Sequence, residues 1–153
     1  MTNYNVSVGD TLPIYDRSGN MGFQSAEDVV MQLFTPFIQH VFRIEDVKSI
    51  DVARYNSVAV VYKVDEQEEI IGWGDHERFI TTTVMADVWT LKDVGVQLIN
   101  SLIQETKINR FGGSFIGRDY VLWVKLLEYE KQEEERNAIN IVFTFEVKRY
   151  KRI

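Results

Sequence analysis

The order of periodic segments in the C-terminal half constrains the fold more than any other feature of the sequence. Residues 80–89 alternate in polarity as a strand does, and residues 91–103 then repeat their apolar positions at helical spacing. Thr90 stands where its side chain can cap that helix, and two further alternating segments, 120–129 and 139–150, follow. The apolar faces carry Ile80, Thr82, Val84, Ala86 and Val88, then Leu91, Val94, Leu98, Ile99, Leu102 and Ile103, and finally Ile141, Phe143, Phe145 and Val147. Because an amphipathic helix must bury its apolar stripe, we expect this helix to cover one face of a mostly antiparallel sheet.

The N-terminal half contains a second helical pattern and a further strand. Ser25 can cap a helix, and apolar residues recur on one broad face as far as Phe42. Pro36 interrupts this pattern, which predicts a kink or two short helices. Residues 58–64 alternate as a strand, and the polar, glycine-containing residues 65–78 predict a long, exposed hairpin loop.

Together these segments predict an α+β fold. We expect a mostly antiparallel sheet of about four strands, with two helices packed on one face and a long exposed β-hairpin. A chain of 153 residues fits a single domain. Within it, residues 1–24 are expected to form an extended N-terminal arm, because Gly9, Pro13 and a polar cluster break any periodicity, and residues 25–153 to form the core.

Composition excludes several classes of protein. The net charge of −6 and the pI near 5.0 disfavour general attraction to a nucleic-acid backbone. The absence of cysteine removes disulfides, thiolate nucleophiles and cysteine-based metal sites. No apolar run approaches the roughly eighteen residues of a membrane helix, and the first residues lack the pattern of a signal peptide. We therefore expect a soluble, intracellular protein.

Charge is unevenly placed along the last two predicted strands. Glutamates crowd residues 128–135 and include Glu133 and Glu134, whereas Lys148 and Arg149 belong to a basic C-terminal cluster. One interpretation is a solvated turn and a solvated chain end, because exposed charge runs are common. The other is a pair of complementary interaction surfaces.

The sequence does not indicate catalytic or cofactor chemistry. Neither His40 nor His76 has a second histidine nearby at metal-ligand spacing. Phosphate-binding, dinucleotide-binding and nucleophile-elbow motifs are missing. Asp75-His76-Glu77 is the one cluster with acid/base or metal-binding groups, and a polar loop tip is the preferred interpretation. We expect no enzymatic activity, no cofactor and no metal.

Trp73 is the aromatic residue that core packing explains least. It lies between two glycines in the predicted hairpin loop, whereas most other aromatic residues occupy alternating strand positions. An aromatic side chain in such a loop has little reason to be buried in its own subunit, which favours an anchor for a partner. Glu68, His76 and Arg78 share the loop and are further interaction candidates.

The order of these elements resembles that of the tail-terminator and tail-completion proteins of long-tailed bacteriophages. The resemblance covers roughly residues 25–150 and rests on pattern rather than on an invariant motif. The segments that carry it are Asn56-Ser57-Val58-Ala59-Val60-Val61-Tyr62, the strand ending in Asp87-Val88-Trp89-Thr90 with the helix that follows to Glu105, and Phe143-Thr144-Phe145-Glu146-Val147-Lys148-Arg149-Tyr150. A longer N-terminal arm and a more acidic final turn depart from the family.

This resemblance implies a structural protein of the virion. Members of the family are small α/β subunits that close into a ring, usually six-fold, at the head-proximal end of the tail. Such a ring stops growth of the tail tube and prepares it for head attachment. The implied partners are further copies of the chain, the tail tube protein and the head–tail connector or neck protein. We expect a head-to-tail contact to close the ring and residues 66–78 to meet the tube or the lumen.

Three alternatives remain open. A neck protein that joins head and tail shares the size and topology of a terminator. An α+β small-molecule-binding or enzymatic domain with its site between helix and sheet is more distant, since the apolar faces show no convergent polar group. A nucleic-acid-binding module that uses aromatic strands is disfavoured by the acidic balance.

Overall fold

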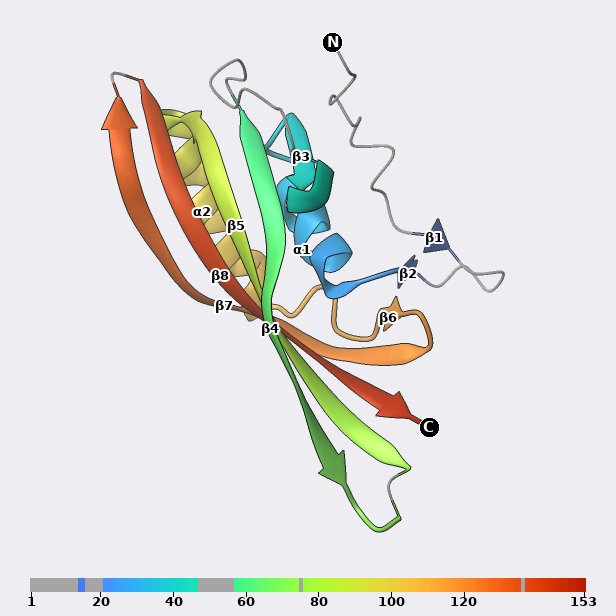
Figure 1. Ribbon diagram of the computed structural model, residues 1–153. Coiled ribbons are helices and arrows are strands. Elements are labelled where there is room, and N and C mark those ends of the chain that lie inside the picture. Colours follow the sequence, from blue (N-terminus) through green and yellow to red (C-terminus); the bar gives the residue numbers. More distant parts are fainter. Residues whose placement is uncertain (1–13, 16–20, 47–56, 75, 136) are drawn as a thin grey trace.

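The computed structural model describes residues 14–15, 21–46, 57–74, 76–135 and 137–153, which form one eight-stranded sheet and two α-helices (Figure 1). The strand order across the sheet is β1-β2-β6-β7-β8-β5-β4-β3. Most of the predicted arm, residues 1–13 and 16–20, lies outside the described residues. The elements are β1 (Ile14–Tyr15), β2 (Met21–Phe23), α1 (Ala26–Phe34), β3 (His40–Arg43), a 3-10 turn (Ile44–Asp46), β4 (Val58–Ile71), β5 (Glu77–Leu91), α2 (Lys92–Lys107), β6 (Phe115–Ile116), β7 (Asp119–Glu135) and β8 (Ala138–Arg152).

The predicted four-stranded antiparallel sheet is wrong, because the sheet has eight strands and is mixed. Four long antiparallel strands form its centre, but β2 pairs in parallel with β6 and β3 pairs in parallel with β4. The strands that the sequence did not reveal, β1, β2, β3 and β6, have between two and four residues each. A segment of that length is too short to show the alternation by which a strand is recognised.

The sheet curls because its long strands contain β-bulges. The pairing of β7 with β8 shifts register three times, and the pairing of β4 with β5 shifts once, between Lys63 and Asp65. Each bulge adds one unpaired residue to one strand and increases the local twist. As a result, β7 and β8 bend around the helices instead of lying flat (Figure 1).

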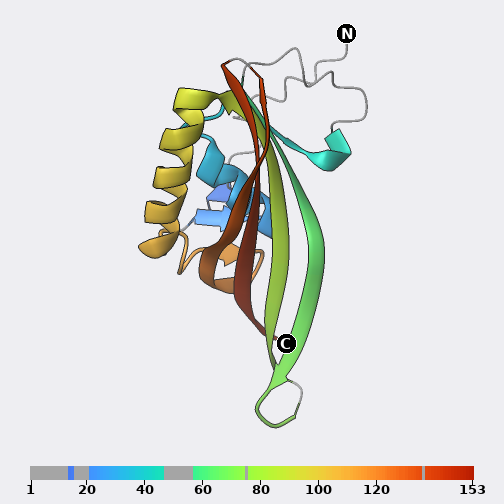
Figure 2. The same cartoon turned by 90° about the vertical axis from the view of Figure 1, so that its left-hand side faces the viewer.

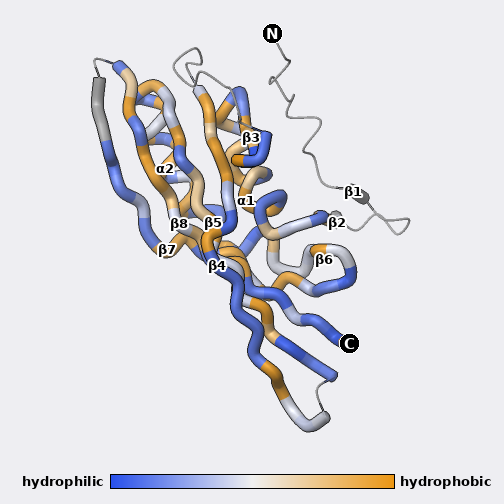
Figure 3. The backbone as a smooth tube through the Cα atoms, viewed as in Figure 1, coloured by the Kyte–Doolittle hydropathy of each residue, from blue (hydrophilic) through white to orange (hydrophobic). Residues whose placement is uncertain are grey.

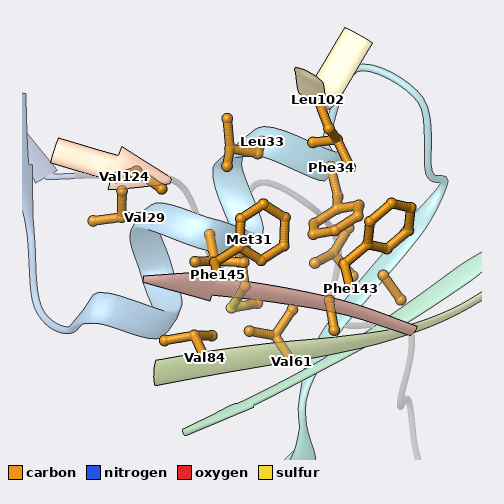
Figure 4. Packing of buried hydrophobic residues seen from close by; sticks show 14 of the residues in the cluster. Val29, Met31, Leu33, Phe34, Val61, Val84, Leu102, Val124, Phe143 and Phe145 are labelled. Carbon is orange, nitrogen blue, oxygen red and sulfur yellow. The ribbon is translucent and has the colours of Figure 1, made fainter. Parts of the chain in front are cut away.

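Both helices lie on the same face of the sheet (Figure 2), and the core lies between them and the long strands. Apolar residues concentrate there along the backbone (Figure 3). Phe34 of α1 packs edge-on against Phe143 and Phe145 of β8, with ring centroids 5.6 and 5.8 Å apart (Figure 4). The apolar faces predicted for β5 and β8 are confirmed, since every residue of both faces is buried: Ile80, Thr82, Val84, Ala86, Val88, Ile141, Phe143, Phe145 and Val147.

Helix α1 is shorter than its apolar pattern suggested. Its start agrees with the prediction, because the Ser25 side chain accepts a hydrogen bond from the Asp28 amide at 3.3 Å. The helix ends at Phe34, and Pro36 lies in the turn beyond it. The predicted continuation to Phe42 is wrong, since these residues form a turn and then strand β3. Proline lacks the amide donor that a continuing helix would need, so the chain leaves the helix there.

Helix α2 begins at Lys92 without a side-chain cap, so the predicted capping role of Thr90 is wrong. Thr90 is the last buried residue of β5, and the Lys92 amide instead donates to the Asn137 carbonyl at 2.8 Å. The buried face of α2 consists of Gly95, Leu98, Ile99 and Leu102, while Leu91 and Ile103 are 46% and 44% exposed. The helix is therefore rotated slightly from the predicted stripe, with a glycine against the sheet.

Gly95 sets the distance between α2 and β8. A Cβ atom added there would lie 2.9 Å from Ile139 Cγ2 and 3.3 Å from Ile141 Cδ1. We expect Gly95→Leu to lower the free energy of unfolding by about 1–3 kcal/mol through overpacking, even though leucine gains about 1 kcal/mol in helix propensity. Urea denaturation measures the change, and Val96→Leu on the exposed side of the same helix is the control. A Gly95→Leu protein as stable as the control would contradict the close packing.

Candidate functional site

The distal hairpin, residues 66–78, is the part of the molecule that projects furthest from the helices (Figures 1 and 2). The sequence predicted a loop over these residues. Most of them instead belong to the two strands, because β4 continues as far as Ile71 and β5 begins at Glu77. The bulge between Lys63 and Asp65 stands where β4 leaves the helix-covered part of the sheet. The hairpin is thus a strand-built extension of the sheet, and its tip lies just beyond the last paired residues, Ile71 and Glu77.

Trp73 occupies the tip of this hairpin and is 100% exposed. Gly72 and Gly74 flank it with φ values of +72° and +90°, a backbone region that residues with a Cβ rarely adopt. The turn therefore depends on these glycines, and it leaves the indole without contact to its own subunit. The sequence-based placement of Trp73 outside its own core is confirmed. An exposed indole at the end of a projection is the side chain type that most often anchors a contact between proteins.

The other candidates on the hairpin hold its shape or form its surface. Arg78 Nη1 donates to Glu68 Oε2 at 2.8 Å, across the two strands. The His76 carbonyl accepts a hydrogen bond from the Ile153 amide at 2.8 Å, which ties the loop to the C-terminal residue. Asp75, the first member of the Asp75-His76-Glu77 cluster, lies outside the described residues. The exposed side chains of β4 near the tip are mostly acidic, and the apolar Ile70 is also exposed there. The backbone of this part of the hairpin is mostly hydrophilic (Figure 3).

The outer edge of β4 is open along the hairpin. Strand β3 pairs only with Val58–Val61, so within the described part of the chain no strand flanks residues 62–71 on that side. Backbone donors and acceptors along an open edge can accept a strand from another chain. The negative charges of Glu66, Glu68 and Glu69 disfavour pairing with a second acidic edge.

The basic candidates Lys148 and Arg149 make contacts within their own chain. Arg149 is 15% exposed and lies 3.0 Å from Asp119 and 3.5 Å from Glu66. The Lys148 ammonium group lies over the rings of Phe79 and Trp123, 4.6 and 4.9 Å from their centroids. Arg149 therefore joins the base of the hairpin to β7. The partners Glu66 and Asp119 are far from it in sequence, so only strand pairing brings them together.

The acidic candidates Glu133 and Glu134 lie at the opposite end of the same strand pair. They pair in register with Asn140 and Ile139 of β8, beside the final turn. Ten residues of β8 separate Ile139 from Arg149, which corresponds to about 33 Å. The acidic and basic clusters therefore cannot meet within one subunit.

The described residues show no cluster arranged to hold a metal ion. Among them, no three His, Asp or Glu side chains converge as metal ligands, and neither helix has the length and apolar character needed to cross a membrane. Partial burial lowers the pKa of His40, which favours the neutral imidazole near pH 7. His40 lies in β3 and stacks on Phe42, with centroids 6.2 Å apart.

One depression of about 170 Å³ lies between the C-terminal ends of the two helices. Its lining is mostly apolar, with one ion pair, and consists of Gln32, Leu33, Pro36, Phe37, Glu105, Arg110 and Phe111. The sequence did not reveal it, because its two halves come from helix ends far apart in the chain. It lies between the helices, and not between helix and sheet as the pocket alternative supposed.

The structure thus defines a class of fold: a curled, mixed sheet covered on one face by two helices and extended by a projecting hairpin. Its sequence matches no protein-family model and no curated protein. Among solved structures, the fold is similar to a chain in the "Virion of native gene transfer agent (GTA) particle". The TM-score is 0.50 at 12% sequence identity, and the match covers 96% of this chain and 94% of the other. At this identity the two chains share a fold, and this fold therefore occurs in a component of a virion.

Proposed function

We propose that this protein is a structural component of a phage-like virion, and that it acts without catalysis as the terminator of the tail. Copies of the chain close into a ring, six-fold as the family resemblance implies, that caps the tail tube and prepares it for head attachment. The observation that carries this proposal is the likeness to a chain of the gene transfer agent virion over 96% of this chain. The match spans nearly the whole of both chains, so it concerns the entire fold.

A ring of identical subunits requires a contact between two different surfaces of the chain. This molecule has clearly different ends, because the distal hairpin projects at one and the acidic turn lies at the other (Figure 1). The proposed pairing of Glu133 and Glu134 with the basic cluster is compatible with that arrangement, since the two clusters are about 33 Å apart in one subunit. This pairing between subunits stays a prediction.

The proposed partners follow from the position of such a ring. One face meets the tail tube protein, and the opposite face meets the connector or neck protein of the head. A neck ring would share the self-assembly but would not bind a bare tail tube. Binding to tail tubes therefore distinguishes a terminator from a neck protein, whereas ring formation alone does not.

The experiment is to measure the mass of the purified protein by light scattering over a concentration series, with negative-stain imaging of the large species. We expect discrete rings with about six times the 17.9 kDa subunit mass. Rings that then cosediment with purified tail tubes support the terminator. Rings that bind a head connector but not the tubes favour the neck protein. A monomer at every concentration that also fails to bind tubes would overturn the proposal.

A further inference from the structure

Two surfaces described above have no role within one subunit, and they fit one another. We infer that Trp73 at the tip of one subunit inserts into the interhelical depression of a second copy of the chain. This inference deepens the proposed ring and rests on it, because it names the contact that joins neighbouring subunits. The proposed occupant of the depression is thus a part of this same chain.

The depression has a mostly apolar lining and a volume large enough for an aromatic ring. Its volume is about 170 Å³, and a closed apolar cavity of about 150 Å³ is enough to hold a benzene ring. Leu33 and Phe111 of its lining are buried residues, and Pro36 and Phe37 add further apolar surface. Trp73 is the complementary group, since it is a large aromatic side chain with no part covered by its own subunit.

Polar groups at the rim match the polar features of the hairpin. Arg110 is 60% exposed in its side chain and lies 3.3 Å from Glu105. Its guanidinium group can stack on the face of an inserted indole, while the Glu105 carboxylate is an acceptor for the indole N–H. In the proposed contact, Arg110 meets a hairpin whose strand β4 carries the exposed Glu69 and also Glu68, which is paired with Arg78 of its own subunit.

The polar lining also contains a buried acceptor with no donor. The Gln32 amide nitrogen donates to Thr35 Oγ1 at 3.3 Å, but Gln32 Oε1 has no hydrogen-bond partner among the described residues. Buried polar atoms normally have a partner. A hydrogen-bond donor of the inserted hairpin could supply this missing partner after a small rotation of the Gln32 side-chain amide.

The hairpin of one subunit cannot reach its own depression. Helix α2 starts at the end of β5 that is far from the tip and runs back beside the sheet (Figure 2). The sixteen residues of α2 span about 24 Å, whereas the fifteen residues of β5 span about 50 Å. The C-terminal end of α2 therefore stops about 25 Å short of Glu77, and the loop places Trp73 still further away. The contact must form between two copies, tip to depression, as a head-to-tail interface does.

The test compares Trp73→Ala and Arg110→Glu with the unmodified protein in the light-scattering series. Each variant alone should raise the concentration at half-assembly at least tenfold, because each removes one side of every contact. Leu127→Ala and Arg118→Ala alter an exposed apolar residue and an exposed cation elsewhere, and they should assemble as the unmodified protein does. Thermal melting verifies that all four variants are folded.

Mixing the two interface variants gives a sharper readout. Trp73→Ala keeps an intact depression and Arg110→Glu keeps an intact tip, so an equimolar mixture should form one-to-one dimers that cannot grow into rings. Rings of Trp73→Ala at the normal concentration would overturn the inference and leave the proposed ring intact. If those rings also fail to bind tail tubes, the tip meets the tube instead of a neighbouring copy. An unmodified protein that stays monomeric overturns the contact, and tube binding then decides the proposed function separately.

Discussion

Phe143→Ala is expected to lower the free energy of unfolding by about 3–5 kcal/mol. The Phe143 side chain is fully buried, and its ring lies 5.6 Å from Phe34, 6.3 Å from Phe145 and 6.2 Å from Tyr129, measured between centroids. Truncation removes apolar area and leaves a cavity at the point where α1 meets β8. Domains are stable by only about 5–15 kcal/mol, so this loss is a large part of the total.

Urea denaturation followed by circular dichroism measures this change in the free energy of unfolding. In thermal denaturation we expect the melting temperature to fall by about 10 °C, because each kcal/mol corresponds to about 2–4 °C in a domain of this size. Leu127→Ala is the control, because Leu127 is 53% exposed at a bulge of β7 and its loss should cost less than about 1 kcal/mol. A Phe143→Ala protein within 1 kcal/mol of the control would show that the aromatic cluster is not central to the core.

Arg43→Met is expected to destabilise the protein by about 3 kcal/mol, because it leaves a buried carboxylate without its cation. Asp28 is 5% exposed, its Oδ2 accepts a hydrogen bond from the Gln24 amide at 3.2 Å, and its Oδ1 is paired with Arg43 Nη2. Partial burial lowers the pKa of Arg43, but the hydrogen bond and charge of Asp28 outweigh it and raise the pKa above its usual value. The cation therefore stays charged wherever the protein is folded.

The matched control for this ion pair is the double variant Arg43→Met, Asp28→Asn. A neutral amide at position 28 needs no cation, so the second change should recover most of the lost stability. The free energies of unfolding of Arg43→Met, Asp28→Asn and the double variant, measured in urea at pH 7, give the coupling between the two residues. If the double variant is less stable than Arg43→Met alone, the ion pair does not act through the buried charge.

The sequence could reveal the long strands and the starting point of α1, because these features repeat over many residues. Ile80 and Phe143 lie on faces whose alternation extends for several positions, and Ser25 stands three residues before the acidic Asp28. The four short strands gave no such signal. Pro36 marked the end of α1, but the apolar residues beyond it kept a helical spacing by chance, and pairing with β4 decides their structure.

For the candidate site, too, the sequence could reveal local features but not those that depend on distant residues. Trp73 could be recognised from its glycine neighbours, since a local turn determines its exposure. The contacts of Arg149 with Glu66 and Asp119 depend on the register of strands β4, β5, β7 and β8. The depression depends on how two helix ends meet above the sheet. Properties of this kind arise from long-range pairing, and no local pattern in the chain reports them.

The continuity of β5 has a mechanical consequence. This strand runs without interruption from the tip region to the start of α2 and is hydrogen-bonded to β4 on one side and to β8 on the other. Hydrogen bonds between antiparallel strands lie perpendicular to the strand axis. A pull on the tip along that axis therefore loads many bonds in shear at the same time, whereas a sideways pull would open them one by one. Tension applied through the hairpin is thus carried directly into the core.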